Sequence, residues 1–280
     1  MAIHIVTDST SDLTPALLAE LGAEVHVVPL TVHFGEEEYK DGVDLDTKGF
    51  YEKLKAGGEM PRTSQPSPAA FLDVYQKVAN PGDVILSFHI SSRLSGTHQS
   101  AVLAARQVEE RRVEVLDTRS VSLGLGLIAA QAARDAKEGK DVEEILATSR
   151  ELIGKVRILF VVDTLEYLQR NGRIGRAQAL VGGLLSIKPI LTLEDGVVTP
   201  VEKVRGKAKA LARIVELACE HAGKVRMGGV MHAAAPEEAQ EFRSELERRL
   251  GVEKLYLAEL GPTVGTHVGP GTLGVVLIVD

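Results

Sequence analysis

The chain has 280 residues, of which 44% are hydrophobic and 25% charged, and its formal net charge is -7 at pH 7. This length and composition are typical of a globular protein with about two domains. The negative charge argues against a nucleic-acid backbone or an anionic membrane as the main partner. No run approaches the roughly 20 apolar residues that span a bilayer, so stable membrane insertion is not expected. The start of the chain lacks the basic segment of a signal peptide, and a single cysteine excludes an intramolecular disulfide. A cytoplasmic location is therefore expected.

The first half of the chain alternates short β-branched segments with helical patterns. Four segments are nearly continuous apolar runs, which is typical of a parallel sheet covered on both faces. They are residues 3–7, 24–30, 83–89 and 113–117. Thr14 and Ser67 are capping residues, each followed by a proline at the first helical position, and Asp141 opens a capping box. Residues 1–156 are therefore predicted to form a three-layer α/β/α domain with a mainly parallel sheet.

The second half, residues 157–280, is predicted to be an α/β domain with a mixed sheet. Two strands flank the turn at residues 194–196 and are expected to form an antiparallel hairpin. The expected strands are 157–162, 188–193, 197–204, 225–232, 254–259 and 273–279. Residues 163–166 have capping-box spacing before a helix. Further helices are expected at 177–185, which is rich in glycine, and at 236–250.

Two matches to the dinucleotide-binding fingerprint are rejected because of their context. Residues 124–129 lie inside a helical pattern and residues 269–274 precede a strand, whereas the fingerprint needs its glycines at a strand-to-helix turn. Asp8 and Asp12 are explained more simply by a capped turn than by a metal pair. We therefore expect neither a metal nor a cofactor.

Hydroxyl side chains and glycine concentrate in two loops of the first half. In residues 62–68, prolines stiffen the loop and leave Thr63 and Ser64 as donors before a helix. Residues 91–97 follow a buried strand and open a helix, where free backbone N–H groups and the helix dipole favour an anion. The donors there are Ser92, Ser95 and Thr97, and Gly96 lets a ligand approach closely. Simple helix capping by one serine explains the second loop about as well.

A third loop, residues 261–271, is long and rich in glycine and proline. Such a loop is a poor place for a packed core histidine, so His267 is interpreted as a donor to a carboxylate, with an ordinary surface histidine as the alternative. Arg173 follows an Asn-Gly pair and Arg205 precedes a glycine. A guanidinium suits phosphate or carboxylate recognition, although most loop arginines are simply solvated.

Taken in order, these pieces resemble the DegV family of fatty-acid-binding proteins, the FakB-type subunits of bacterial fatty acid kinase. The matching strings extend over nearly the whole chain, and their order makes the resemblance specific. They are residues 8–10, 63–67, 91–97, 163–168, 171–175, 188–191, 204–206 and 266–271. The chain departs from the family pattern at Asn171, where a second glycine is common, and at His98, where a tyrosine is expected.

The resemblance implies that a long-chain fatty acid lies in an apolar tunnel between the two domains. Residues matching Thr63, Ser92 and His267 would hold its carboxylate, supported by Ser95 and neighbouring backbone. The protein would not be an enzyme itself. It would present the carboxylate to a separate ATP-dependent kinase subunit that makes an acyl-phosphate for phospholipid synthesis, with an arginine matching Arg205 implicated in the transfer.

Two other classes of function stay open at this stage. A serine hydrolase or acyltransferase could use Ser92 or Ser95 with His267, although the chain lacks a nucleophile elbow and an evident acidic third member. A phosphate- or sugar-binding protein could use the same helix start, and it would need a polar pocket in place of an apolar tunnel.

Overall fold

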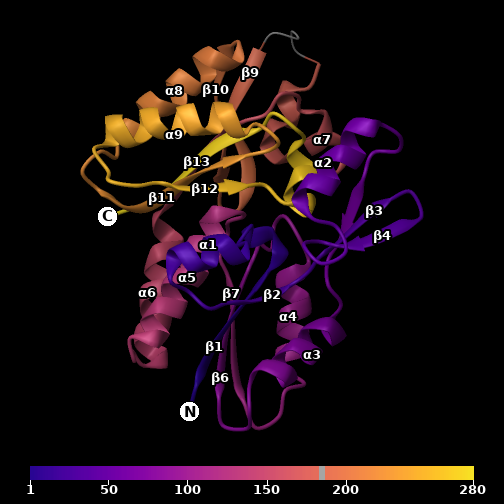
Figure 1. Ribbon diagram of the computed structural model, residues 1–280, viewed down its shortest axis with the longest axis vertical. Helices are drawn as coiled ribbons and strands as arrows, with labels where there is room; N and C mark the ends of the chain where they lie inside the picture. The colour runs from indigo at the N-terminus through magenta and orange to yellow at the C-terminus, as the bar shows by residue number, and fades with distance from the viewer. Residues whose placement is uncertain (183–186) are drawn as a thin grey trace.

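The computed structural model describes residues 1–182 and 187–280. The parallel N-terminal sheet and its helices occupy the lower part of Figure 1 and the C-terminal sheet and its helices the upper part, and residues 31–56 lie at the upper right. The N-terminal sheet has the order β2-β1-β6-β7, and its paired strands are parallel, as expected. The strands are β1 (Ile3–Asp8), β2 (His26–Val28), β6 (Val84–His89) and β7 (Arg112–Asp117).

Helices cover both faces of this parallel sheet. One face packs against α3 (Pro68–Val78) and α4 (Thr97–Ala105), and the other against α1 (Pro15–Leu21) and α5 (Leu123–Lys137), while α6 (Val142–Lys155) packs on α5. The predicted caps are present. Thr14 and Ser67 each accept a hydrogen bond from a backbone N–H three residues later, and Asp141 forms a complete capping box.

The C-terminal sheet is mixed, with the order β10-β9-β8-β13-β11-β12. Strands β11 and β12 are parallel and the other neighbours antiparallel, including the predicted hairpin of β9 and β10. The strands are β8 (Val156–Val161), β9 (Ile187–Glu194), β10 (Val197–Arg205), β11 (Val225–His232), β12 (Tyr256–Glu259) and β13 (Leu273–Val279). Helices α8 (Lys207–Cys219) and α9 (Pro236–Leu250) cover the outer face (Figure 1).

The inner face of the C-terminal sheet packs toward the other half of the chain. In β13, Val275 and Leu277 belong to the core under α8 and α9, whereas Val276 and Ile278 belong to the core shared with the N-terminal half. This alternation follows from the two-residue period of a strand. Helix α5 contacts β1 and β6 on one side and β8, β11 and β13 on the other. The halves therefore share one core, and the domain boundary at residue 156 stays a prediction, although β8 does begin at Val156.

Several local predictions were wrong. A second, antiparallel sheet was missed, made of β3 (Thr31–Phe34), β4 (Glu37–Lys40) and β5 (Arg62–Ser64), together with helix α2 (Thr47–Ala56). The first predicted loop therefore begins as an edge strand. The glycine–proline loop 261–271 contains helix α10 (Pro262–Val268), in which Gly265 lies against the rings of Phe50 and Tyr51, so that a Cβ there would fall 2.7 Å from each.

The expected capping box at residues 163–166 is also absent. Helix α7 (Glu166–Arg170) follows Leu165, which makes no side-chain cap. The predicted helix 177–185 corresponds to the short 3-10 helix η2 (Gly175–Leu180), and residues 183–185 lie outside the described part of the chain. Across the described residues, no helix has the length and apolar character needed to cross a membrane.

Candidate functional site

An internal cavity lies between the carboxyl ends of the parallel strands and the inner face of the C-terminal sheet. It contains about 820 Å³ of atom-free space, its open mouth included. Most of the wall is apolar. The apolar side chains are Leu30, Ile90, Leu94, Val121, Ile158, Phe160, Leu168, Leu193, Val198, Met231, Leu260, Val264 and Val268.

Two predicted site residues meet at a polar part of this wall. Thr63 lies on β5, which pairs with β3, and His267 lies in the last turn of α10. The Thr63 hydroxyl and Nε2 of His267 are 2.8 Å apart, a hydrogen bond in which either group can donate, depending on the tautomer. Both residues line the cavity.

Arg173 and Ser95 line the cavity as well. The Arg173 guanidinium donates to the carbonyl oxygens of Leu94 at 3.0 Å and Asn171 at 2.7 Å, and it makes no ion pair with any described carboxylate. Ser95 Oγ lies 2.8 Å from the Thr97 hydroxyl at the start of α4. An unneutralised guanidinium and a serine at a helix start form a suitable environment for an anion.

His267 is neutral at physiological pH in this environment. Burial, and to a lesser extent the nearby positive charge of Arg173, lower its pKa to about 3. Its Nδ1 atom is buried and has no hydrogen-bond partner among the described residues. A neutral imidazole has one N–H, so His267 can donate one hydrogen bond while Arg173 carries the positive charge.

The family model described as "Uncharacterised protein, DegV family" matches residues 2–280. The chain belongs to the DegV family. A DegV domain-containing protein of Caldanaerobacter subterraneus subsp. tengcongensis is 40% identical over 276 residues, which cover 98% of this chain and 97% of that protein. The resemblance inferred from the ordered motifs is thereby confirmed.

Solved structures of DegV proteins share the fold over the full length. A DegV family protein of Thermus thermophilus, described by its fatty acid binding, is 39% identical, with a TM-score of 0.92 and 100% of both chains covered. DegV of Bacillus subtilis, described as a fatty acid binding protein, is 37% identical, with a TM-score of 0.91 and the same coverage. The expected α/β architecture, with a parallel N-terminal sheet and a mixed C-terminal sheet, is confirmed.

Ser92, which was predicted to contact the carboxylate, does not lie in the wall of this cavity. It is exposed, and its hydroxyl donates to Asp117 Oδ2 at 2.5 Å and its backbone N–H to Asp117 Oδ1. Ser95, three residues later, lines the cavity instead. Both serines lie in the turn that precedes α4, which begins at Thr97.

Three further candidates also lie outside the wall. The Ser64 hydroxyl is 2.9 Å from Nε2 of His33 on the exposed side of β5. Thr97 is buried behind Ser95. Gly96 is packed against the Gln65 side chain, since a Cβ there would lie 2.2 Å from its amide oxygen. The absence of a side chain at Gly96 therefore accommodates Gln65, rather than a ligand.

Arg205 ends β10 and is exposed, outside the cavity wall.

The hydrolase alternative gains no support from the surroundings of His267. Thr63, not a serine, is the neighbour of His267 Nε2, and no described carboxylate is hydrogen-bonded to Nδ1. In the described part of the chain, no group of three His, Cys, Asp or Glu side chains could hold a metal ion.

Several wall residues had no recognisable signal in the sequence. Thr10, Ser122, Thr263 and Thr272 add polar atoms to the wall, and they come from four separate places in the fold: the 3-10 turn after β1, the residue before α5, the first turn of α10 and the residue before β13. Of these, only Thr10 lies in a string that matches the family. The apolar residues of β8, β9 and β10 lie in predicted strands, and nothing in their pattern distinguishes a side chain facing a cavity from one facing a packed neighbour.

Proposed function

We propose that this DegV-family chain binds a long-chain fatty acid in the cavity between its two sheets. Its carboxylate lies at the polar part of the wall, where Thr63, Ser95 and His267 donate hydrogen bonds and Arg173 supplies positive charge. The acyl chain runs along the apolar side chains. The observation that supports this most is a largely apolar cavity whose polar part combines the positive charge of Arg173 with the hydrogen-bond donors named above. The fatty acid binding described for the Thermus and Bacillus relatives agrees with it.

The energetics of such a ligand are favourable. Burying a methylene contributes about 0.8 kcal/mol, so about 14 methylenes contribute roughly 11 kcal/mol before the costs of association. Each charge-assisted hydrogen bond to the carboxylate adds about 1.5–3 kcal/mol. The acyl chain supplies most of the affinity, and the polar part of the wall sets the orientation of the ligand.

The chain itself is proposed to be the non-catalytic, cytoplasmic subunit of a fatty acid kinase system. A separate kinase subunit would phosphorylate the bound carboxylate with ATP, giving an acyl-phosphate for phospholipid synthesis. Arg173 lies where it can contact the carboxylate, and Arg205 lies on the exposed end of β10, where a partner protein can reach it. An arginine stabilises the charge that develops on phosphoryl oxygens during transfer.

Mass spectrometry of the purified protein tests the first part of this proposal. Under native conditions we expect an added mass equal to a host fatty acid, and the same acid after solvent extraction. Delipidated protein should take up palmitate with a negative change in heat capacity, the mark of buried apolar surface. The proposal fails if extraction releases no fatty acid and calorimetry detects no uptake.

A further inference from the structure

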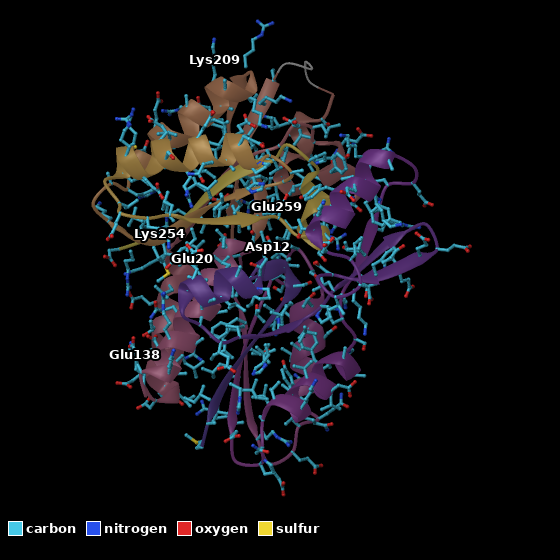
Figure 2. The ribbon with its side chains drawn as sticks, viewed as in Figure 1. Asp12, Glu20, Glu138, Lys209, Lys254 and Glu259 are labelled. Carbon is cyan, nitrogen blue, oxygen red and sulfur yellow. The ribbon has the colours of Figure 1, made fainter. Side chains whose placement is uncertain are left out.

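The start of α10 is held by two carboxyl groups from the opposite half of the chain. The backbone N–H of Gly261 donates to Asp12 Oδ1 at 2.9 Å, and that of Thr263 donates to Asp41 Oδ2 at 3.2 Å. The two carboxyls approach so closely that a Cβ on Gly261 would lie 3.1 Å from Asp12 and 3.5 Å from Asp41. Figure 2 shows Asp12 at the junction of the two halves.

Tyr51 of α2 adds a third contact to the same segment. Its hydroxyl donates to the carbonyl of Leu260 at 2.9 Å, and its side chain is buried against Gly265. Asp12 follows β1, Asp41 follows β4 and Tyr51 lies in α2, so three separate elements converge on one turn. These three residues are called the α10 clamp below.

The clamp affects the cavity through the short helix α10, which connects the two. Helix α10 has seven residues, with the clamped turn at one end and His267 at the other. On one helix face, Val264 and His267 both line the cavity. Thr63, the hydrogen-bond partner of His267, lies on β5 and moves with the N-terminal half. A shift of the first turn of α10 relative to that half would therefore change the spacing between Thr63 and His267.

We propose that Asp12, Asp41 and Tyr51 are positioning residues for the carboxylate site, which hold α10 so that His267 stays beside Thr63. The proposal rests on the function proposed above, because it assigns these residues to the recognition of the fatty acid head group. None of the three touches the ligand cavity itself. They act through the backbone of α10.

The clamp is sensitive to pH because its carboxyls are buried without a cation. Burial raises the pKa of Asp12 to about 8 and that of Asp41 to about 6. The negative charge of Asp8 raises the pKa of both carboxyls, and Asp41 also raises that of Asp12. Tyr51, which is itself influenced by Asp12, Asp41 and Glu259, adds no positive charge, and no described residue forms an ion pair with Asp12 or Asp41. Near pH 7, Asp12 keeps its proton while Asp41 is ionised. As the pH rises through about 8, two adjacent carboxylates face each other.

The sign of the pH effect follows from these raised pKa values. The clamped state binds protons more tightly than a state in which α10 has moved away and the carboxyls are hydrated. Stabilisation of the clamped state is therefore lost as the pH rises through the pKa of Asp12, and it is largest at low pH. The preference for a fatty acid over its methyl ester is expected to weaken over the same pH range.

Two substitutions at Asp12 separate its role as a hydrogen-bond acceptor from the effect of its ionisation. Asp12→Asn keeps an oxygen for the Gly261 N–H and cannot ionise, whereas Asp12→Ala removes the acceptor. Tyr51→Phe removes the hydroxyl and keeps the ring. Asp135→Asn is the matched control, because Asp135 is a buried carboxyl of α5 that pairs with Lys140, away from α10. Amide hydrogen exchange at Gly261 and Thr263, corrected for intrinsic rates, measures the clamp in the ligand-free protein between pH 6 and 9.

We expect the wild-type protection factors at these amides to fall about tenfold between pH 7 and 9, and those of Asp12→Asn to stay constant. Asp12→Ala should show low protection throughout, and its preference for myristic acid over the methyl ester should fall at least about fivefold. Tyr51→Phe should also lower the protection of these amides and the preference for the acid over the methyl ester. Asp135→Asn should change neither.

The proposal is overturned if Asp12→Asn keeps the wild-type pH profile, or if Asp12→Ala keeps the wild-type preference for the acid. A purely structural role would lower the melting temperature and leave both of these readouts unchanged. If Asp12→Ala does not fold, the Asn and Phe variants still decide the question. Wild-type protein that binds no fatty acid contradicts the proposed function, and the exchange profiles then decide separately whether the clamp holds α10.

Discussion

The Thr63 hydroxyl and Nε2 of His267 lie 2.8 Å apart, although 204 positions separate the two residues in the sequence. Thr63 belongs to the small sheet of the N-terminal half, and His267 belongs to a helix of the C-terminal half. Their contact joins the two halves at the polar part of the cavity wall. A ligand carboxylate placed there would accept hydrogen bonds from both residues at once.

Replacing Thr63 by valine tests this contact at nearly constant volume. Because a carboxylate loses one hydrogen-bond donor, Thr63→Val should weaken binding of the fatty acid by about 1–3 kcal/mol and binding of its methyl ester much less. Calorimetry with both ligands measures the difference. Ser64→Ala is the control, since the Ser64 hydroxyl contacts His33 on the exposed side of the same strand. Equal losses for acid and ester would mean that Thr63 only shapes the cavity.

The pair Ser95 and Ser92 tests which serine of the turn before α4 contacts the carboxylate. Ser95→Ala should reduce affinity for the acid by about 1–3 kcal/mol, because Ser95 lines the cavity. Ser92→Ala should leave the affinity near that of the wild type, because its hydroxyl is bound to Asp117. Displacement of a fluorescent fatty acid provides the measurement. A large loss with Ser92→Ala alone would restore the assignment made from the sequence.

Binding of an anion should raise the pKa of His267. The value is about 3 in the ligand-free protein because of burial and the charge of Arg173, and a carboxylate nearby favours the protonated imidazole. Arg173→Met should also raise this pKa without ligand, since it removes the repelling charge. Nitrogen-15 NMR of the histidine rings, recorded from pH 3 to 8 with and without palmitate, follows both changes. An identical titration of His267 in all samples would place the carboxylate elsewhere.

Substitutions of Arg205 test ligand binding and presentation to the kinase separately. Arg205→Ala should keep near-normal affinity for the fatty acid and depress acyl-phosphate formation with the kinase subunit and ATP, because an arginine can stabilise charge in the transition state without improving ground-state binding. Arg205→Lys should recover part of the turnover, since an ammonium lacks the planar fork. Lys209→Ala is the control, because it removes a neighbouring exposed cation of α8 (Figure 2). Full turnover by Arg205→Ala would exclude this arginine from the transfer.

The sequence by itself determined most of the secondary structure and the family. The caps at Thr14, Ser67 and Asp141 and the hairpin turn at Asp195 depend on hydrogen bonds between residues at most a few positions apart, so they can be recognised in the sequence. Continuous apolar runs likewise identified the parallel sheet, because strands covered on both faces need apolar side chains at every position.

Tertiary structure decided which of the candidate side chains form the site. Ser92 and Ser95 are equivalent in composition, and their roles differ because Asp117, at the end of the neighbouring strand, binds Ser92. Loop 261–271 was predicted to be irregular, yet contacts with Tyr51 and Asp12 from the other half hold a helix there. These interactions join residues that are 25 to 249 positions apart. Such partners leave no local pattern, because side-chain contacts of that range exist only after the chain has folded.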